Sequence, residues 1–343
     1  MEKVFKFSNK SIIFSVILVL VSLTISVSIG AAEISTDEIV EIFLREILGY
    51  QSNTEINNIN KIIVLEWRLP RFCLGFLVGA SLAIAGCGFQ GVFKNPLADP
   101  FLLGSAAGAG LGVTLVIVND LNYSFGIINS VQLGAFIGAL GAVICAAFIS
   151  ISAGKSIASL LLAGIATAAF LTACQTYLMH KYYSSMQEIY SWIIGRLLTS
   201  GWEDVITILP YFTVCFIIIF LFRKELDLLR LSEDEAKMLG GNPRRTYFIV
   251  LTASSLLTAV AVSLSGLIAF VGLVIPHILR LTVSSSYRII IPLSALVGGS
   301  FLTIADTFSR TVISPSELPI GIVTAFIGAP FFAFLLKASK GSF

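Results

Sequence analysis

The residue types that most often carry chemistry are sparse in this sequence. Its five cysteines lie singly in apolar stretches and form no CxxC pair, whereas a metal site or a disulfide framework requires thiols paired at short spacing. The two histidines, His180 and His277, are too few and too far apart to indicate a zinc site, and a membrane enzyme would need clustered His, Asp, Glu or Cys side chains. We therefore predict no catalytic residue, no metal site and no cofactor in this chain.

Two glycine-rich stretches look like nucleotide-binding loops at first sight. Residues 153–156 (AGKS) end like a Walker A loop, but Ile149 stands where that pattern requires glycine. Residues 108–112 (GAGLG) lie inside an apolar stretch. Small residues let membrane helices approach closely, so we interpret both stretches as packing surfaces and expect no ATPase activity from this chain.

Three arginines and one aspartate stand out because they border or interrupt apolar sequence. Arg68 and Arg71 flank Pro70, and Arg310 follows Asp306 by four residues, a spacing that places both on one helix face. The arginines either snorkel to lipid headgroups or form a docking site for an acidic partner. For Asp306 we favour an internal ion pair with Arg310 over a proton relay.

The elements that position these residues must be membrane helices. The chain has 343 residues, of which 56% are hydrophobic and only 12% charged, against about 25% charged in soluble domains. The net charge of +2 leaves no basic surface for nucleic acid. A spanning helix needs about 20 residues. Nine stretches without Asp, Glu, Lys or Arg meet or approach this length: 11–32, 72–93, 100–119, 121–154, 156–180, 205–222, 246–279, 289–305 and 318–336.

The stretch 246–279 is too long for one simple span. Gly266, Gly272 and Pro276 favour a break within it, so we predict a full helix near 247–265 and a shorter one near 271–282. The basic N-terminus before residue 11 resembles a signal peptide, but the run 11–32 exceeds the usual apolar core of one, and we keep it as a membrane helix. The sequence thus predicts a single all-α polytopic membrane domain over residues 1–343, with about ten transmembrane helices.

Charge bias sets the expected orientation. By the positive-inside rule, the basic segment 223–245 and both termini belong on the cytoplasmic side. The basic residues of the termini are Lys3, Lys6 and Lys10 at the start and Lys337 and Lys340 at the end. An even number of helices agrees with two cytoplasmic termini. The mostly acidic segment 33–67 is then an outer loop, and the three arginines lie toward that outer side.

The segment 223–245 contains a second candidate site. Ser232 and Glu235 form a capping-box pattern, and Gly240 and Gly241 precede Pro243, which ends a helix. We predict a short cytoplasmic helix over 233–239. It is either a solvated loop helix or a lever that docks into a groove on a cytoplasmic partner.

Seven motifs in the same order then resemble the FecCD-type permease subunits of type II ABC importers, which carry iron–siderophore complexes, haem and cobalamin. The resemblance covers about residues 60–340. The motifs are RLPR (68–71), NPLADP (95–100), LLLAGIA (160–166), WIIG (192–195), GLIAFVGLVIPH (266–277), ADT (305–307) and ELPIGIVTA (317–325).

The resemblance implies a set of partners and sites. The partners are a second permease copy, identical or distinct, two ATPase subunits that bind ATP and magnesium, and an extracytoplasmic substrate-binding protein, in the cytoplasmic (inner) membrane of a prokaryote. The implied docking residues are Arg68, Arg71 and Arg310. The implied ATPase-coupling residues are Leu231, Glu235, Ala236, Leu239 and Gly240. The implied cytoplasmic gate comprises Asn95, Leu97, Ala158 and Ser159.

Substrate identity is weakly encoded. A ferric siderophore is the default, and cobalamin, haem and metal oxoanions remain open. An ion-coupled secondary transporter is the remote alternative, since such carriers also use broken helices, but it needs ionisable groups near the bilayer midplane, where only Asp306 is a candidate.

Overall fold

The computed structural model describes residues 9–30, 32–49, 57–154, 156–197 and 201–338. Lys3, Lys6 and Lys340, on which part of the orientation argument rests, lie outside these residues. In the described part, seven helices are long and apolar enough to cross a membrane, and three shorter apolar helices accompany them. The prediction of about ten apolar helices is therefore confirmed.

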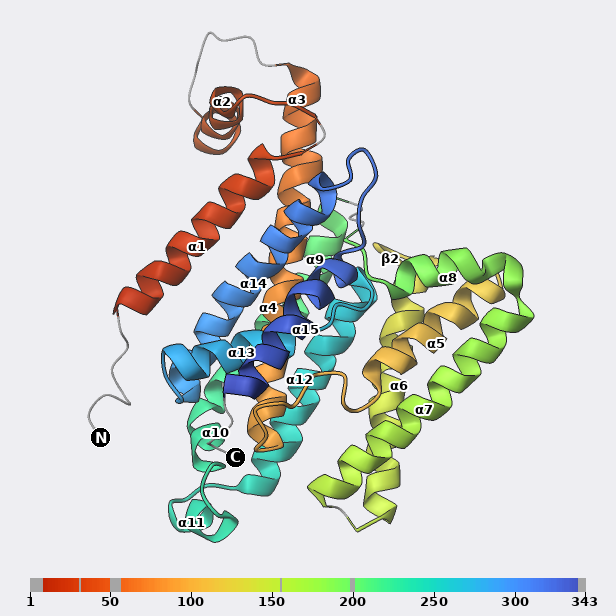
Figure 1. Cartoon of the computed structure of the whole chain (residues 1–343), viewed down its shortest axis with the longest axis vertical. Coiled ribbons are helices and arrows are strands. Elements are labelled where there is room, and N and C mark those ends of the chain that lie inside the picture. Colours follow the sequence, from red (N-terminus) through yellow and green to blue (C-terminus); the bar gives the residue numbers. More distant parts are fainter. Residues whose placement is uncertain (1–8, 31, 50–56, 155, 198–200, 339–343) are drawn as a thin grey trace.

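The long helices give the molecule its main axis (Figure 1). They are α1 (Asn9–Ser28), α4 (Leu69–Val92), α6 (Ser130–Ser152), α7 (Ile157–Lys181), α9 (Trp202–Leu221), α12 (Pro243–Ser265) and α14 (Tyr287–Thr311). The shorter apolar helices are α5 (Ser105–Val118), α13 (Val271–Thr282) and α15 (Ile320–Ala338). The connecting elements are α2 (Thr36–Leu48), α3 (Asn58–Ile62), a π-helical turn (Ile63–Arg68), β1 (Ser124–Phe125), β2 (Ile128–Asn129), a 3₁₀ turn (Tyr183–Ser185), α8 (Met186–Ile193), α10 (Arg223–Leu228) and α11 (Glu233–Met238).

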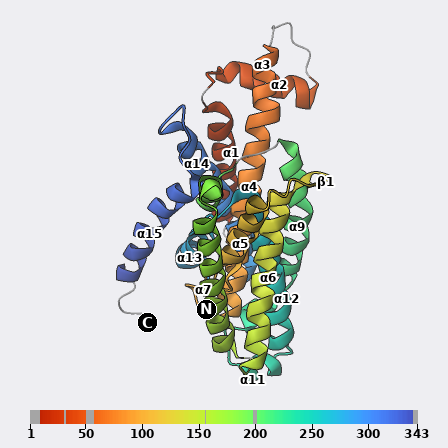
Figure 2. The ribbon, with the colours of Figure 1, turned by 90° about the vertical axis from the view of Figure 1, so that its right-hand side faces the viewer.

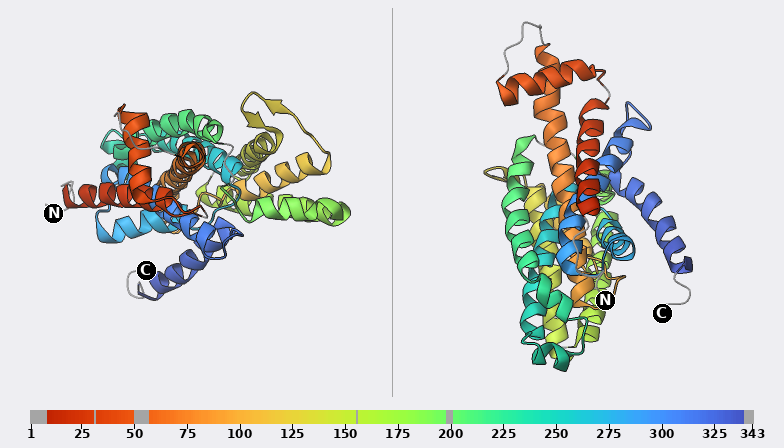
Figure 3. Two further views of the ribbon diagram at one scale, coloured as in Figure 1. Left: turned by 90° about the horizontal axis from the view of Figure 1, so that it is seen from above. Right: turned by 90° about the vertical axis from the view of Figure 1, so that its left-hand side faces the viewer.

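The molecule has two distinct ends. Helices α2 and α3 mark one of them, the α2 end, and α10 and α11 mark the other, the α11 end (Figure 1). Seen from the side, α2 lies across the α2 end of the bundle (Figure 3). Within the segment 33–67, expected as an outer loop between two spans, the described residues include α2 and α3. Ser35 caps α2 at its start, and Gly49 at φ +67° ends it.

Helix α4 is the centre of the bundle. In the span that contains it, 89% of the most apolar window is buried, compared with 17% for α7, and α4 packs against α9, α12, α13 and α14. Close packing requires glycine at one point in particular, because a Cβ on Gly86 would lie 1.8 Å from the carbonyl oxygen of Gly272 in α13. Backbones that touch in this way are typical of membrane helices joined through small residues.

Helices α5, α6 and α7 form a second group beside the first (Figure 1). Large apolar side chains of α7 point away from the protein: Leu162, Ile165 and Phe170 are 60–68% exposed. Helix α15 leans away from the bundle on another side (Figure 2). Lipid or another protein must cover these surfaces, because exposure of large apolar patches to water is unfavourable.

The predicted helix break is confirmed. Helix α12 ends at Ser265 and α13 begins at Val271, close to the expected limits of 247–265 and 271–282. Gly266 at φ +67° and Phe270 at φ +70° turn the chain between them. The left-handed conformation is natural for glycine and costly for phenylalanine, so surrounding contacts must hold Phe270 in place.

Candidate functional site

The α2 end carries a compact charged cluster, the arginine cluster, formed by Arg68, Arg71, Asp306, Arg310 and Glu317. The Asp306 carboxylate accepts from Arg71 Nε at 3.0 Å and Nη2 at 2.9 Å, and Arg310 Nε lies 3.1 Å from Asp306 Oδ2. The predicted internal pair of Asp306 and Arg310 is thus confirmed. Arg71 also donates to both oxygens of Glu317, at 3.0 and 2.9 Å, a bidentate geometry that strengthens an ion pair.

Arg68 has a different set of partners. It is 5% exposed, and its guanidinium donates to the carbonyl oxygens of Val27 at 2.6 Å, Ser28 at 3.1 Å and Ala32. The last carbonyls of a helix lack intrahelical donors, and a cation favours that end of the helix dipole. Arg68 therefore caps the end of α1.

Arg310 reaches the same helix end. Its Nη2 donates to the Ser26 carbonyl oxygen at 3.2 Å. The structure thus brings the three sequence-predicted arginines to one end of the molecule, and each already has partners there. Glu317 is the accessible member: its side chain is 38% exposed, against 15% for Arg71 and 4% for Asp306. The sequence reasoning did not assign Glu317 a role, although it lies in a quoted motif.

Electrostatics keep Glu317 ionised. Its partial burial raises the pKa of the carboxyl, but the hydrogen bonds and charge of Arg71 outweigh that effect, and the pKa lies below its usual value. The cluster therefore exposes the ion pair of Arg71 and Glu317, and the buried Asp306 holds the guanidinium of Arg71 in place.

The α11 end carries the predicted coupling segment. Helix α11 begins after Ser232, whose hydroxyl accepts from Glu235 N at 3.3 Å, while Glu235 Oε2 accepts from Ser232 N at 3.0 Å. These contacts hold the pKa of Glu235 below its usual value and confirm the capping box. The helix ends at Met238, one residue earlier than predicted.

The exposed tip of this segment is apolar. Leu239 is 64% exposed, Leu231 39%, and Met238, which the sequence reasoning did not single out, 86%. Gly240 at φ +82° forms the exposed turn that follows. Ala236, by contrast, is 1% exposed, so its side chain supports the turn from inside and cannot meet a partner.

Polar contacts fasten this segment to the membrane helices. Asp227 in α10 accepts from Ser286 Oγ at 2.7 Å and from Tyr287 N at 2.9 Å at the start of α14. Arg230 Nη1 donates to the Ser285 carbonyl at 3.2 Å, and Lys94 Nζ donates to the Leu231 carbonyl at 3.0 Å. Sequence reasoning missed these contacts because nothing local distinguishes Asp227 from the other charges of the segment.

The four predicted gate residues lie in two neighbouring turns. Asn95 Oδ1 accepts from Leu97 N at 2.9 Å, and Ser159 shares a capping box with Ser156 at the start of α7, where Ala158 is exposed. Apolar neighbours join the turns: Ile157, Leu160 and Leu161 pack against the buried cluster that contains Phe93, Ala98 and Leu103.

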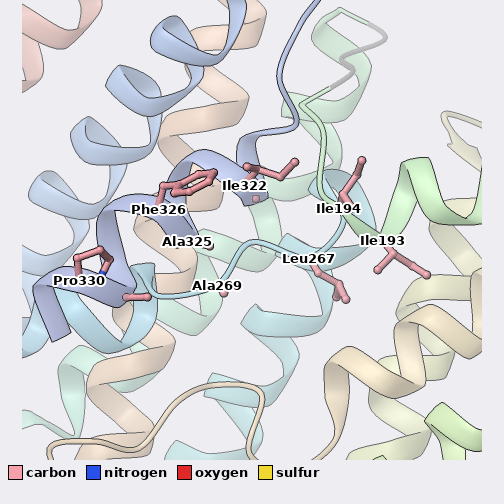
Figure 4. Close-up of a pocket in the computed structure, with 10 residues that line it drawn as sticks. Ile193, Ile194, Leu267, Ala269, Ile322, Ala325, Phe326 and Pro330 are labelled. Carbon is pink, nitrogen blue, oxygen red and sulfur yellow. The ribbon is translucent and has the colours of Figure 1, made fainter. Parts of the chain in front are cut away.

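An apolar hollow of about 540 Å³ lies beside the helix break. Figure 4 shows Ile193 and Ile194, Leu267 and Ala269 of the break, and Ile322, Ala325, Phe326 and Pro330 of α15 around it. The lining offers almost no polar group. Among the described residues, no three His, Cys, Asp or Glu side chains gather in a way that could hold a metal ion.

Comparisons with known proteins agree with these features. A sequence model described as the FecCD transport family matches residues 18–338. The Fe(3+)-citrate import system permease protein of Bacillus subtilis is 38% identical over 328 residues, covering 95% of this chain and 94% of that protein. The cobalamin import system permease protein of Halobacterium salinarum is 40% identical over 278 residues, covering 81% and 74%.

A solved ABC transporter structure in an inward-facing conformation matches with a TM-score of 0.82 and 28% identity, covering 96% of this chain and all of that one. The match therefore extends over nearly the whole chain. The chain belongs to the FecCD transport family and is a multi-span membrane permease subunit of the ABC importer type.

Proposed function

We propose that this permease forms the translocation pathway of an importer for a ferric siderophore, with docking at the α2 end and ATP-driven coupling at the α11 end. The observation that carries this proposal is the pairing of an arginine cluster at one end with an anchored, apolar-tipped helix at the other. The basic residues of the segment 223–245 support a cytoplasmic position of the α11 end, and we propose that both termini lie on that side as well.

Docking uses the arginine cluster. An extracytoplasmic binding protein presents carboxylates, and the charge of Arg71, Arg68 and Arg310 attracts them. Arg71 makes the direct contact, because it lies next to the exposed Glu317. Arg68 and Arg310 fix the end of α1 and thereby the shape of the docking surface.

Coupling uses α11. Leu231, Met238 and Leu239 form an exposed apolar tip that fits a groove on an ATPase subunit, as amphipathic helices commonly do. Glu235 holds the helix start through its capping box, and Gly240 shapes its end. Two ATPase subunits bind ATP and magnesium, and their closure moves the segment.

A second permease copy completes the pathway. The exposed apolar side chains of α7 and the hollow beside α15 are surfaces that a partner copy covers. The turns that hold Asn95, Leu97, Ala158 and Ser159 then face each other across the inner end of the pathway and narrow it. We infer a homodimer, with a heterodimer as the alternative.

The proposed substrate rests on the relatives. They are named as permeases for Fe(3+)-citrate or cobalamin import, and among the described residues of this chain no cluster of His, Cys, Asp or Glu could hold the metal of a chelate. Selection therefore rests with the binding protein. A ferric siderophore is the substrate we propose, and cobalamin, haem or a metal oxoanion is the alternative.

Uptake measurements test the proposal. Cells with and without this gene are given radiolabelled ferric siderophore, haem or cobalamin. We expect cells without the gene to lose uptake of the ferric siderophore and to keep uptake of haem and cobalamin. In cells that carry the gene, we expect ferric siderophore uptake to stop when the partner ATPase is inactivated. Loss of only haem or cobalamin uptake would overturn the substrate, and uptake that follows a proton or sodium gradient without the ATPase would overturn the importer.

A further inference from the structure

A chain of hydrogen bonds runs from the coupling segment into the membrane helices. It starts at Asp227 in α10, which accepts from the backbone N–H of Tyr287. Ser286, the residue before α14, makes no side-chain cap of its own and instead donates its hydroxyl to Asp227. The first N–H groups of a helix need acceptors and favour a negative charge, so Asp227 caps α14 from another element.

The chain continues through Tyr287 and Arg280. The Tyr287 side chain is 1% exposed, and its hydroxyl accepts from Arg280 Nη1 at 3.1 Å. The guanidinium carbon lies 5.1 Å from the centre of the Tyr287 ring, within the range of a cation–π contact. Arg280 belongs to the last turn of α13, so the two contacts join the end of α13 to the start of α14.

Gln90 of α4 closes the chain. Its Oε1 accepts from Arg280 Nη2 at 3.0 Å, and its Nε2 donates to the carbonyl oxygen of Leu273 at 3.1 Å. Leu273 lies in the first turn of α13, directly after the helix break. Gln90 therefore holds both the beginning and the end of α13, and it is itself 1% exposed.

A buried polar network of this kind costs free energy at the ends of membrane helices. Polar and charged groups are disfavoured within membrane spans, and those present usually serve function. The packing around them is close: a Cβ on Gly91 would lie 2.7 Å from Leu226 Cδ2 and 3.1 Å from the Tyr287 hydroxyl. Arg280 Nε and His277 Nδ1 are buried without a hydrogen-bond partner among the described residues, which leaves hydrogen-bonding capacity for a second arrangement of α13.

We propose that Asp227, Tyr287, Arg280 and Gln90 act together as positioning residues, a transmission linkage that carries movement of the α10–α11 segment to the break between α12 and α13. This inference rests on the proposed function and deepens it. When α10 moves, Asp227 takes the start of α14 with it, and Tyr287 and Arg280 pull on α13. Gln90 keeps α13 moving as one body, so bending concentrates at residues 266–270, where Leu267 and Ala269 line the hollow against α15.

Removing one oxygen atom tests the linkage. Tyr287→Phe deletes the hydroxyl that receives Arg280 and leaves the ring, the helix start and the Asp227 contact in place. Tyr247→Phe is the matched control, because the Tyr247 hydroxyl is also buried near the α11 end but has no hydrogen-bond partner among the described residues. The complete complex, with its ATPase and binding protein, is reconstituted in lipid vesicles with a radiolabelled ferric siderophore.

The readout is substrate transported per ATP hydrolysed. We expect Tyr287→Phe to lower this ratio about three- to tenfold, the scale of one lost hydrogen bond, while ATPase activity of the assembled complex stays similar. Tyr247→Phe should keep the wild-type ratio. A merely structural role of Tyr287 would lower assembly or thermal stability and leave the ratio unchanged, and that result would overturn the inference.

A second variant tests whether the four residues act together as one linkage. Gln90→Leu should lower the ratio in the same way, and the double variant with Tyr287→Phe should be little worse than either single one, because contacts in one network are not additive. Fully additive losses would contradict the linkage. If Gln90→Leu does not fold, Asp227→Asn replaces it in the same cycle. A wild-type complex without ATP-dependent uptake would instead refute the proposed function itself.

Discussion

At the scale of single residues, Arg71 holds two carboxylates of very different accessibility. Asp306 is buried beneath it, and Glu317 lies beside it at the surface. In the docking proposed above, a carboxylate of the binding protein reaches Arg71 by displacing Glu317, whereas Asp306 stays in place. Under this proposal Glu317 competes with the binding protein for the same guanidinium.

Glu317→Gln should tighten binding of the substrate-binding protein. We expect an affinity gain of about two- to fivefold, the range of an exposed ion pair, measured with the complex in lipid nanodiscs. Glu66→Gln is the control for general charge effects, since Glu66 is also exposed and lies close to Arg68 in sequence. Weaker binding by Glu317→Gln would mean that Glu317 orients Arg71 for docking instead of competing for it.

The pH dependence of this gain follows from the lowered pKa of Glu317. A carboxyl with a depressed folded-state pKa keeps its ion pair above its ordinary pKa and loses it as the pH falls through the depressed value. The affinity difference between wild type and Glu317→Gln should therefore persist at neutral and mildly acidic pH and shrink only below about pH 4. A difference that vanishes at mildly acidic pH would contradict this assignment.

At the scale of elements, α11 has a start fixed by its capping box and an exposed apolar tip at its other end. Replacing Met238 and Leu239 together by Glu should weaken association with the ATPase about tenfold or more, as truncation of apolar anchors does at other interfaces. Lys237→Gln is the control, because Lys237 is exposed on the same helix but is not apolar. Co-purification of the ATPase in detergent measures the effect, and unchanged recovery with the double variant would exclude α11 as the contact.

The contact between α4 and α13 gives a second prediction at this scale. Gly86→Ala should destabilise the permease by about 1–3 kcal/mol, the usual cost of overpacking, because its Cβ would meet the Gly272 carbonyl. Gly141→Ala in α6 is the matched control, since nothing lies within 4 Å of a Cβ there. Thermal unfolding in detergent compares the two, and equal stability would contradict the close approach of the helices.

The elements were largely predictable because a continuous apolar stretch of sequence is enough to indicate a membrane helix. Charge-free stretches predicted the spans, and Gly266 with Pro276 predicted the break at 266–270. The extension of α4 back through α3 was not predicted, because Glu66 and Arg68 interrupt the apolar run. Arg68 fits there because it turns inward to cap α1, a contact that local sequence does not reveal.

The candidate sites were predictable only in part, for the same reason. The capping box of α11 is a local pattern, and it was found. Arg71 and Asp306 are 235 residues apart in the chain, and Arg280 and Gln90 are 190 residues apart. Local spacing carries no signal for such pairs, so Asp227, Gln90 and Glu317 acquire their interest only from the folded structure.

At the scale of the whole molecule, the proposed docking and coupling sites lie at opposite ends of one bundle, and α4 connects them. Arg71 belongs to its first turn and Gln90 to its last. A largely buried helix of this kind transmits displacement with little loss, because packed interiors are stiff. Events at the two ends are therefore expected to influence each other in both directions.

The exposed apolar strip of α7, formed by Leu162, Ile165 and Phe170, leads to a genetic test of whether two identical copies pair. If two copies of this chain cover that strip for each other, a cell that makes both wild-type and Tyr287→Phe protein will build mixed dimers, and the defect will be dominant over the wild-type allele. If a distinct second permease covers it instead, the wild-type allele will be dominant and growth on the iron chelate will be restored. A merodiploid strain thus distinguishes the two assemblies by growth alone.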